Sequence, residues 1–129
     1  MKVCDIVQFY SPLSGGVKRY IRDKMRFLAS IPDIEHAVII PSHRSGVQTE
    51  YRSRVYELES MRLIGSQSYR MLLSRKRIEE ILDNERPDVI EVGDPYRSAW
   101  IAADYAERHG LPILSYYHSD YPRALKRTI

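Results

Sequence analysis

Apolar runs and amphipathic segments alternate along the chain, and this alternation predicts strands separated by helices. Short apolar runs bounded by turn residues are typical of buried strands, and apolar positions three or four residues apart are typical of helices. The predicted strands are residues 2–10, 36–41, 54–60 and 88–93, with a fifth in 111–122 that runs into a loop. The predicted helices are residues 16–29, 68–87 and 94–110, with a further helix starting within 123–129. Residues 42–53 are polar and are predicted to form a loop.

Turn and capping residues support the ends of the predicted helices. Ser14 is a suitable N-cap for the first helix, which the sequence Ser-Ile-Pro-Asp at 30–33 ends. The second helix ends before Pro87. Asp94 and Pro95 start the third helix, and Gly110 closes it.

Strands that alternate with helices predict an α/β fold, a Rossmann-like parallel sheet with helices on both faces. The 129 residues contain no internal repeat or linker pattern and fit one domain, residues 1–129. In such sheets ligands bind beyond the carboxyl ends of the strands. The candidate segments that follow strand ends are SPLSGG at 11–16, GDPYRS at 93–98 and YYHSDYP at 116–122.

The charge of the chain is mildly basic and spread along its length. Lys and Arg number 20 against 17 Asp and Glu, a net charge of +3. Two helix faces could meet anionic lipid headgroups, but solvent-exposed faces are the favoured interpretation. The basic residues concerned are Lys18, Arg19, Arg22 and Arg26 in the first helix and Arg70, Arg75, Lys76 and Arg77 in the second. Because no nucleic-acid motif or aromatic stacking platform accompanies them, no nucleic-acid partner is expected.

Cysteine and histidine usage predicts neither a disulfide nor a metal site. Cys4 is the only cysteine and is predicted to be a small buried residue. No two histidines have a metal-ligand spacing on one helix face. His36 is predicted at a strand edge, His43 in a loop and His109 at a helix end.

No signal-peptide pattern opens the chain, and no apolar stretch approaches the ~20 residues that span a bilayer. A cytoplasmic location is therefore expected, with peripheral contact at the inner membrane face left open.

Gly15 and Gly16 stand between the first predicted strand and the first helix. Backbone N–H groups at a helix N-terminus attract anions, and glycine allows a phosphate to approach closely. A tight turn would also explain the pair, and is the favoured interpretation from these two residues alone. The segment matches neither the dinucleotide fingerprint G-x-G-x-x-G nor the P-loop.

His118 and Asp94 are the polar candidates at the other two strand ends. His118 could hydrogen-bond a sugar hydroxyl or a departing phosphate, or could be a hydrogen-bonded loop residue. Its position in a polar loop at a strand end favours function. Asp94 could accept hydrogen bonds from a sugar or polyol, could cap the following helix, or could do both.

Three segments together resemble the N-terminal half of a GT-B glycosyltransferase of the retaining family 4. They are PLSGGVKRYI at 12–21, RPDVIEVGDPYRSAWIA at 86–102 and GLPILSYYHSDYPRAL at 110–125. The last is most similar to mannosyltransferase-like members that act on lipid acceptors. The resemblance implies transfer of a hexosyl group from a nucleotide-diphosphate sugar to a lipid or polyol-type acceptor, with retention. It implies no metal and no cofactor besides that co-substrate.

The resemblance also implies roles for individual residues. Gly15 and Gly16 would approach the donor diphosphate, and His118 would line the donor sugar and act in catalysis. Lys18 would face the acceptor, while Tyr20 and Ile21 pack inward. The remaining acceptor-side residues would be Asp94, Tyr96, Ser119, Asp120 and Arg123.

The resemblance covers only the acceptor-side part of such an enzyme. GT-B enzymes have a second domain that carries most nucleotide contacts, and its motifs are not in these residues. An incomplete N-terminal domain, inactive by itself, is therefore expected. The alternatives are a non-catalytic Rossmann-like domain that binds a phosphate or nucleotide, and a different Rossmann-like enzyme such as a nucleotide-sugar epimerase or a deacetylase partner.

Overall fold

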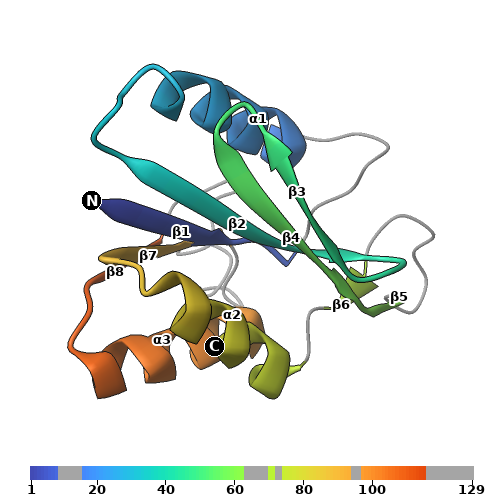
Figure 1. Cartoon of the computed structure of the whole chain (residues 1–129). Helices are drawn as coiled ribbons and strands as arrows, with labels where there is room; N and C mark the ends of the chain where they lie inside the picture. Colours follow the sequence, from blue (N-terminus) through green and yellow to red (C-terminus); the bar gives the residue numbers. More distant parts are fainter. Residues whose placement is uncertain (9–15, 63–69, 72–73, 94–96, 116–129) are drawn as a thin grey trace, which may run out of the picture.

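A six-stranded sheet runs through the centre of the computed structural model (Figure 1). The structure describes residues 1–8, 16–62, 70–71, 74–93 and 97–115. Across the sheet the strand order is β3-β4-β2-β1-β7-β8. The strands are β1 (Lys2–Ile6), β2 (Glu35–Ser42), β3 (Gly46–Glu50), β4 (Ser53–Glu59), β7 (Val89–Val92) and β8 (Ile113–Ser115).

Five of the six strands are parallel neighbours, and β3 pairs antiparallel with β4 at one edge. The predicted loop at 42–53 is therefore wrong, because residues 46–50 form β3. Four of the five β3 residues are exposed, so the strand lacks the alternation of apolar residues that marks a half-buried strand. A separate antiparallel pair joins β5 (Met61–Arg62) to β6 (Arg70–Met71).

Helices cover both faces of the sheet, which confirms the predicted α/β, Rossmann-like architecture (Figure 1). Helix α1 (Gly16–Leu28) lies on one face, and α2 (Arg75–Glu85) and α3 (Arg97–His109) lie on the other. The second helix begins later than predicted. Ser74 is its N-cap, and its hydroxyl accepts a hydrogen bond from the backbone N–H of Arg77 at 3.3 Å.

Two apolar cores follow from the alternation of side chains along the strands. Cys4 and Ile6 of β1 point toward α2 and α3, whereas Val7 packs beneath α1. Burial of Cys4 is confirmed, and that burial raises the pKa of its thiol. The core beneath α1 consists of Val7, Ile21, Met25, Val38, Ile40 and Val55.

Helix α1 buries one face of its surface, as the spacing of its apolar residues predicts. Ile21 is 1% exposed, but Tyr20 is 38% exposed, so the expectation that Tyr20 packs inward is wrong. Successive residues of a helix are about 100° apart around its axis, so the neighbour of a fully buried residue lies at the border of the apolar face.

The ends of the helices match the predicted turn chemistry. Gly110 has φ 65°, and the N–H of Leu111 donates to the carbonyl of Ala106 at 2.8 Å, which closes α3 as predicted. At the end of α1, the guanidinium of Arg52 donates to the carbonyls of Ala29 and Ile31 at 3.1 and 3.2 Å, and to that of Pro32 at 3.4 Å. Arg52 lies in the β3–β4 turn and therefore ties this turn to the segment that follows α1.

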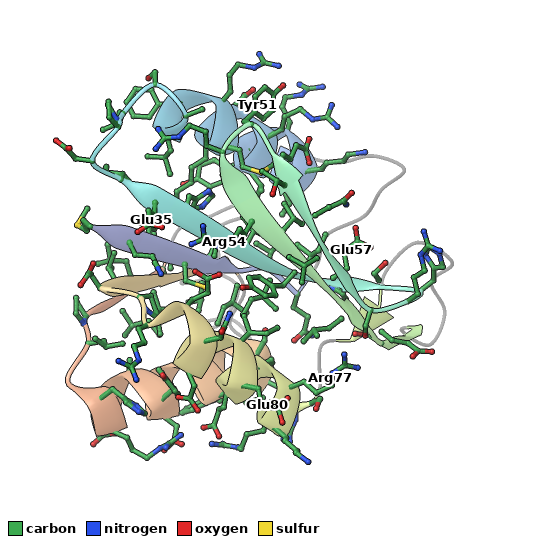
Figure 2. The ribbon with its side chains drawn as sticks, in the orientation of Figure 1. Glu35, Tyr51, Arg54, Glu57, Arg77 and Glu80 are labelled. Atoms are coloured by element: carbon green, nitrogen blue, oxygen red, sulfur yellow. The ribbon has the colours of Figure 1, made fainter. Side chains whose placement is uncertain are left out.

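A buried carboxylate at the end of α2 joins the helix to the sheet. Glu85 is 3% exposed, and Arg54 donates to its two oxygens at 2.7 and 2.6 Å. The Tyr56 hydroxyl also donates to this carboxylate, and Lys2 pairs with it at 3.3 Å. Figure 2 shows Arg54 between the strands, close to Glu35, whose Oε1 lies 3.5 Å from an Arg54 nitrogen. Burial alone would raise the pKa of Glu85, but the hydrogen bonds from Arg54 and Tyr56 outweigh it and lower the pKa to about 2.

Replacing Glu85 with Gln should destabilise the protein and remove part of its sensitivity to acid. The loss should be about 1–3 kcal/mol at pH 7, because the Arg54 guanidinium, whose side chain is 33% exposed, and the Tyr56 hydroxyl lose their charged acceptor. Since the pKa of Glu85 falls from 4.5 to about 2 on folding, its stabilising effect is complete above pH 4.5 and is lost as the pH falls toward 2. Urea unfolding of wild type and Glu85→Gln from pH 7 to pH 2 measures both effects.

The difference in unfolding free energy between the two proteins should therefore shrink between pH 4.5 and 2. Asp104→Asn is the control, because Asp104 pairs with Arg75 and Arg108 at the exposed surface and should contribute little. A Glu85→Gln protein as stable as wild type at pH 7 would contradict the assigned role of this carboxylate.

Candidate functional site

The carboxyl ends of β1, β7 and β8 lie side by side at one edge of the sheet. These strands are parallel neighbours, paired Val3 to Val89 and Ile90 to Ile113. The chain moves from β1 to β2 and β4 on one side, then returns to place β7 and β8 on the other. The order of strands thus reverses beside β1, and ligands of open α/β sheets bind at such a switch point. The three segments singled out in the sequence follow these three strands.

Two of the predicted site residues lie in the described part of the chain. Gly16 is the first residue of α1 and is exposed, and Lys18 is half-buried in the first turn of the same helix. The other predicted residues lie outside the described residues, so their roles stay predictions. They are Gly15, Asp94, Tyr96, His118, Ser119, Asp120 and Arg123.

Nothing within the described structure requires glycine at position 16. Its φ is outside the left-handed region, and a Cβ placed there would meet no described atom within 4 Å. The residue also opens a helix, where backbone N–H groups and the helix dipole favour an anion. The open space at the Cβ position of Gly16 is compatible with a close approach of a ligand.

A buried hydrogen-bonded pair ties the end of β1 to the start of α3. Gln8 and Ser98 are 3% and 2% exposed. The Gln8 side-chain carbonyl accepts hydrogen bonds from the Ser98 hydroxyl at 3.1 Å and from the Ser98 backbone N–H at 3.4 Å. The N–H of Gly93 donates to the carbonyl of Ile6 at 3.3 Å and extends the pairing of β1 with β7. These hydrogen bonds therefore hold the ends of β1 and β7, from which the two segments begin, in place relative to each other.

The sequence analysis missed Gln8. One feature of the sequence could have indicated it, namely an amide side chain at the end of a largely apolar run. A buried amide needs hydrogen-bond partners, so such a residue is expected to tie the strand to a neighbouring element.

A second polar network lies between α1 and the sheet. The His36 Nε2–H group donates to Asp5 Oδ2 at 2.6 Å, and His36 Nδ1 shares a hydrogen bond with the Ser53 hydroxyl at 2.7 Å. On the other side of Asp5, the Lys24 ammonium donates to Asp5 at 3.0 Å and also to Glu91. His36 is thus buried in a central strand and not at a strand edge as predicted. The pairing of β2 with β4 places His36 opposite Ser53, and the pairing of β2 with β1 brings it near Asp5. The sequence pattern does not reveal these pairings.

The order Ser53–His36–Asp5 resembles a nucleophile, a base and an orienting carboxylate. The exposed fractions of the three residues are 1%, 2% and 0%, so no substrate reaches Ser53. The network is therefore structural.

Burial alone lowers the pKa of Lys24, but Asp5 and Glu91 outweigh that effect, and the pKa rises above its ordinary value. Lys24 thus stays charged between its two carboxylates at neutral pH.

Most of the predicted basic helix residues are exposed to solvent, as the favoured interpretation predicted, but Lys18 is half-buried and Arg70 lies in β6 and not in α2. Arg19, Arg22 and Arg26 are exposed on α1, and Arg26 donates to the hydroxyl of Tyr51 at 3.2 Å. Figure 2 shows Tyr51 beside α1, and Arg77 and Glu80 on α2. Arg75 pairs with Asp104 across α2 and α3 at 2.7 Å.

Across the described ranges, no three His, Cys, Asp or Glu side chains gather in an arrangement that could hold a metal ion. None of the helices in this part of the chain has the length and apolar character needed to cross a bilayer.

Comparison with known protein families gives one match. Residues 14–129 match the family model described as Glycosyltransferase Family 4. The matched range includes α1, the whole sheet except β1, and all three segments beyond the strand ends except residues 11–13. Searches of curated proteins and of solved structures found no match.

Replacing Gln8 with Leu should destabilise the protein, because it leaves the N–H and hydroxyl of Ser98 buried without their acceptor. A buried donor that loses its partner costs about 1–3 kcal/mol. Gln8→Glu keeps the acceptor oxygens but buries a negative charge, and should therefore destabilise the protein as well. Thermal unfolding of the two variants beside wild type measures the effect. Equal melting temperatures for Gln8→Leu and wild type would show that the pair contributes nothing.

Proposed function

Because the chain belongs to glycosyltransferase family 4, we propose that residues 1–129 form the acceptor-side domain of a hexosyltransferase. The enzyme transfers a sugar from a nucleotide-diphosphate donor to a lipid or polyol-type acceptor, with retention at the anomeric carbon. A mannosyltransferase-like reaction at the cytoplasmic face of the membrane is the specific form of this proposal.

The observation that carries the proposal is the convergence at one sheet edge. β1, β7 and β8 end side by side, and the segments that follow them carry the motifs of the family resemblance. Sequence segments far apart in the chain thus begin at neighbouring points. A ligand in the crevice beyond these strands could contact all three segments.

Each proposed role is the one that the family resemblance implies, and the chemistry of the residue is compatible with it. The amides of Gly15 and Gly16 receive the donor diphosphate, and His118 hydrogen-bonds the donor sugar. Lys18 stands one turn or less from Gly16 on α1 and faces the acceptor. Asp94, Tyr96, Ser119, Asp120 and Arg123 complete the acceptor side.

The proposed reaction exchanges one bond at the anomeric carbon for another. The bond from the anomeric carbon to the diphosphate oxygen breaks, and a bond to the acceptor hydroxyl oxygen forms on the same face. The leaving phosphate takes the acceptor proton, so no side-chain base is needed. Donors aimed at the departing diphosphate, such as helix amides, stabilise the charge that develops on it.

The proposal is tested by incubating the full-length protein with a panel of sugar nucleotides and measuring transfer and donor hydrolysis. At least one donor should be consumed, and His118→Ala should lower kcat by two or more orders of magnitude, as expected for a group that acts at the reacting centre. Binding of a nucleotide without any turnover would support the non-catalytic alternative. Full activity of His118→Ala would show that its assignment is wrong.

Replacing Gly16 with Ala separates the stability of α1 from donor binding. The variant should be as stable as wild type or more so, because alanine favours a helix and its Cβ meets open space. If the diphosphate approaches the amide of Gly16, the added methyl group should raise the donor KM by roughly tenfold. Steady-state kinetics and thermal unfolding of the same preparation measure the two effects.

Gly46→Ala is the matched control for this experiment. Gly46 begins β3, and a Cβ there also meets no described atom within 4 Å. Its donor KM should equal that of wild type. An unchanged donor KM in Gly16→Ala would remove Gly16 from the donor site.

A further inference from the structure

Two carboxylates face the same side of the sheet on the neighbouring strands β1 and β7. Asp5 and Glu91 are partners in the parallel register, so their side chains leave the sheet on one face. Asp5 is fully buried, and the Glu91 side chain is only 20% exposed. Like charges placed opposite each other on adjacent strands destabilise a sheet. A cation between them is therefore needed at this place.

Lys24 supplies that cation from α1. Its ammonium lies 3.0 Å from Asp5 and donates to Glu91 as well, and its side chain is 14% exposed. Asp5 has a second partner, since His36 donates to its Oδ2 atom. Glu91 faces Leu114, its register partner on β8, which is 54% exposed. Lys24 therefore joins α1 to both strands at the switch point.

The apolar contacts of α1 are distributed unevenly over the sheet. Val17, Ile21 and Met25 pack in a core formed by residues of β2, β4 and the end of β1. That core contains no residue of β7. The apolar core thus holds α1 against one half of the sheet, and the ion pair of Lys24 with Glu91 reaches the other half.

This link lies close to the proposed site. Lys24 is eight residues from Gly16, about 12 Å along the helix axis at 1.5 Å per residue. A helix seated on one side only can rotate about its apolar contacts, which would displace its N-terminus relative to the ends of β1 and β7. We propose that Lys24 is a positioning residue, which holds the N-terminus of α1 in register with β7 so that the glycine segment faces the donor. This inference rests on the proposed function.

The test uses a charge-balanced variant of the full-length protein, Lys24→Met/Glu91→Gln. Lys24→Met alone leaves two facing carboxylates without their cation and should lower stability. The second substitution removes one of those charges, and Asp5 keeps its hydrogen bond from His36. The double variant should therefore recover most of the stability, while the link between α1 and β7 stays broken.

Two measurements on the double variant then separate positioning from stability. Amide hydrogen exchange at residues 20–23, the first amides with acceptors inside the helix, should be roughly tenfold faster than in wild type, because the first turns of α1 open more often. The donor KM should rise about tenfold with kcat within twofold, because displaced binding groups weaken donor binding. Lys24→Arg keeps a cation and should have a donor KM close to that of wild type. Arg22→Met is the control on the same helix, since Arg22 is exposed and 3.9 Å from Glu50, and it should change neither measurement.

A folded double variant with wild-type exchange at residues 20–23 would overturn the inference. Faster exchange with an unchanged donor KM would overturn it too, because the link would then have no effect on the donor. If the wild-type protein transferred no sugar from any donor of the panel, the proposed function would fail. In that case the exchange measurement alone decides whether Lys24 holds the N-terminus of α1.

Discussion

Burial of β1 on both faces is the constraint on which the rest of the structure depends. Cys4 and Ile6 fill the core beneath α2 and α3, and Val7 fills the core beneath α1. Between them Asp5 is fully buried, so the face beneath α1 must provide partners for a carboxylate. His36 and Lys24 provide them. The burial of one strand thus explains why polar side chains from β2, β7 and α1 meet inside an otherwise apolar layer.

The buried polar groups have different tasks at the two ends of the sheet. Glu85, Arg54 and Tyr56 join α2 to the sheet near the starts of β1 and β4. Gln8 and Ser98 act at the opposite end, where they join β1 to α3. Buried polar groups whose hydrogen bonds are satisfied restrict a structure to one arrangement more strongly than apolar contacts do. The strand ends at the candidate site are therefore held in place by side-chain contacts.

Much of this fold follows from the sequence pattern. Helices α1 and α3 and strands β2 and β7 are marked by their apolar positions and by proline or glycine at their ends, β4 by its apolar positions alone, and the structure confirms all five. β3 escaped prediction because an exposed edge strand has no apolar face. The start of α2 was misplaced because Met71 and Leu72 continue its helical spacing, although β6 contains Met71. The sequence pattern does not reveal which residues are paired across strands, and for that reason the partners of His36 and Gln8 were missed.

The sequence predicts at which edge of the sheet the candidate site lies, but it reveals few of the contacts between the residues there. The rule that ligands bind beyond parallel strand ends locates the three segments, and the observed order of β1, β7 and β8 makes those ends neighbours. Gly16 lies at the predicted helix start. The residues that fix the surroundings of the site, Lys24 and Gln8, attract attention only when their partners on distant strands are known.

The contact of Arg52 with the end of α1 has a consequence for how the chain folds. Three carbonyls of the segment that follows the helix, those of Ala29, Ile31 and Pro32, are bound by one guanidinium from the β3–β4 turn. The last turn of α1 is closed locally, by the N–H groups of Ala29, Ser30 and Ile31, so Arg52 fixes the connection between α1 and β2 and not the helix itself. Ordering of this connection and docking of the β3–β4 hairpin are therefore coupled. The edge strand that lacks an apolar face thus takes part in folding through the turn that it carries.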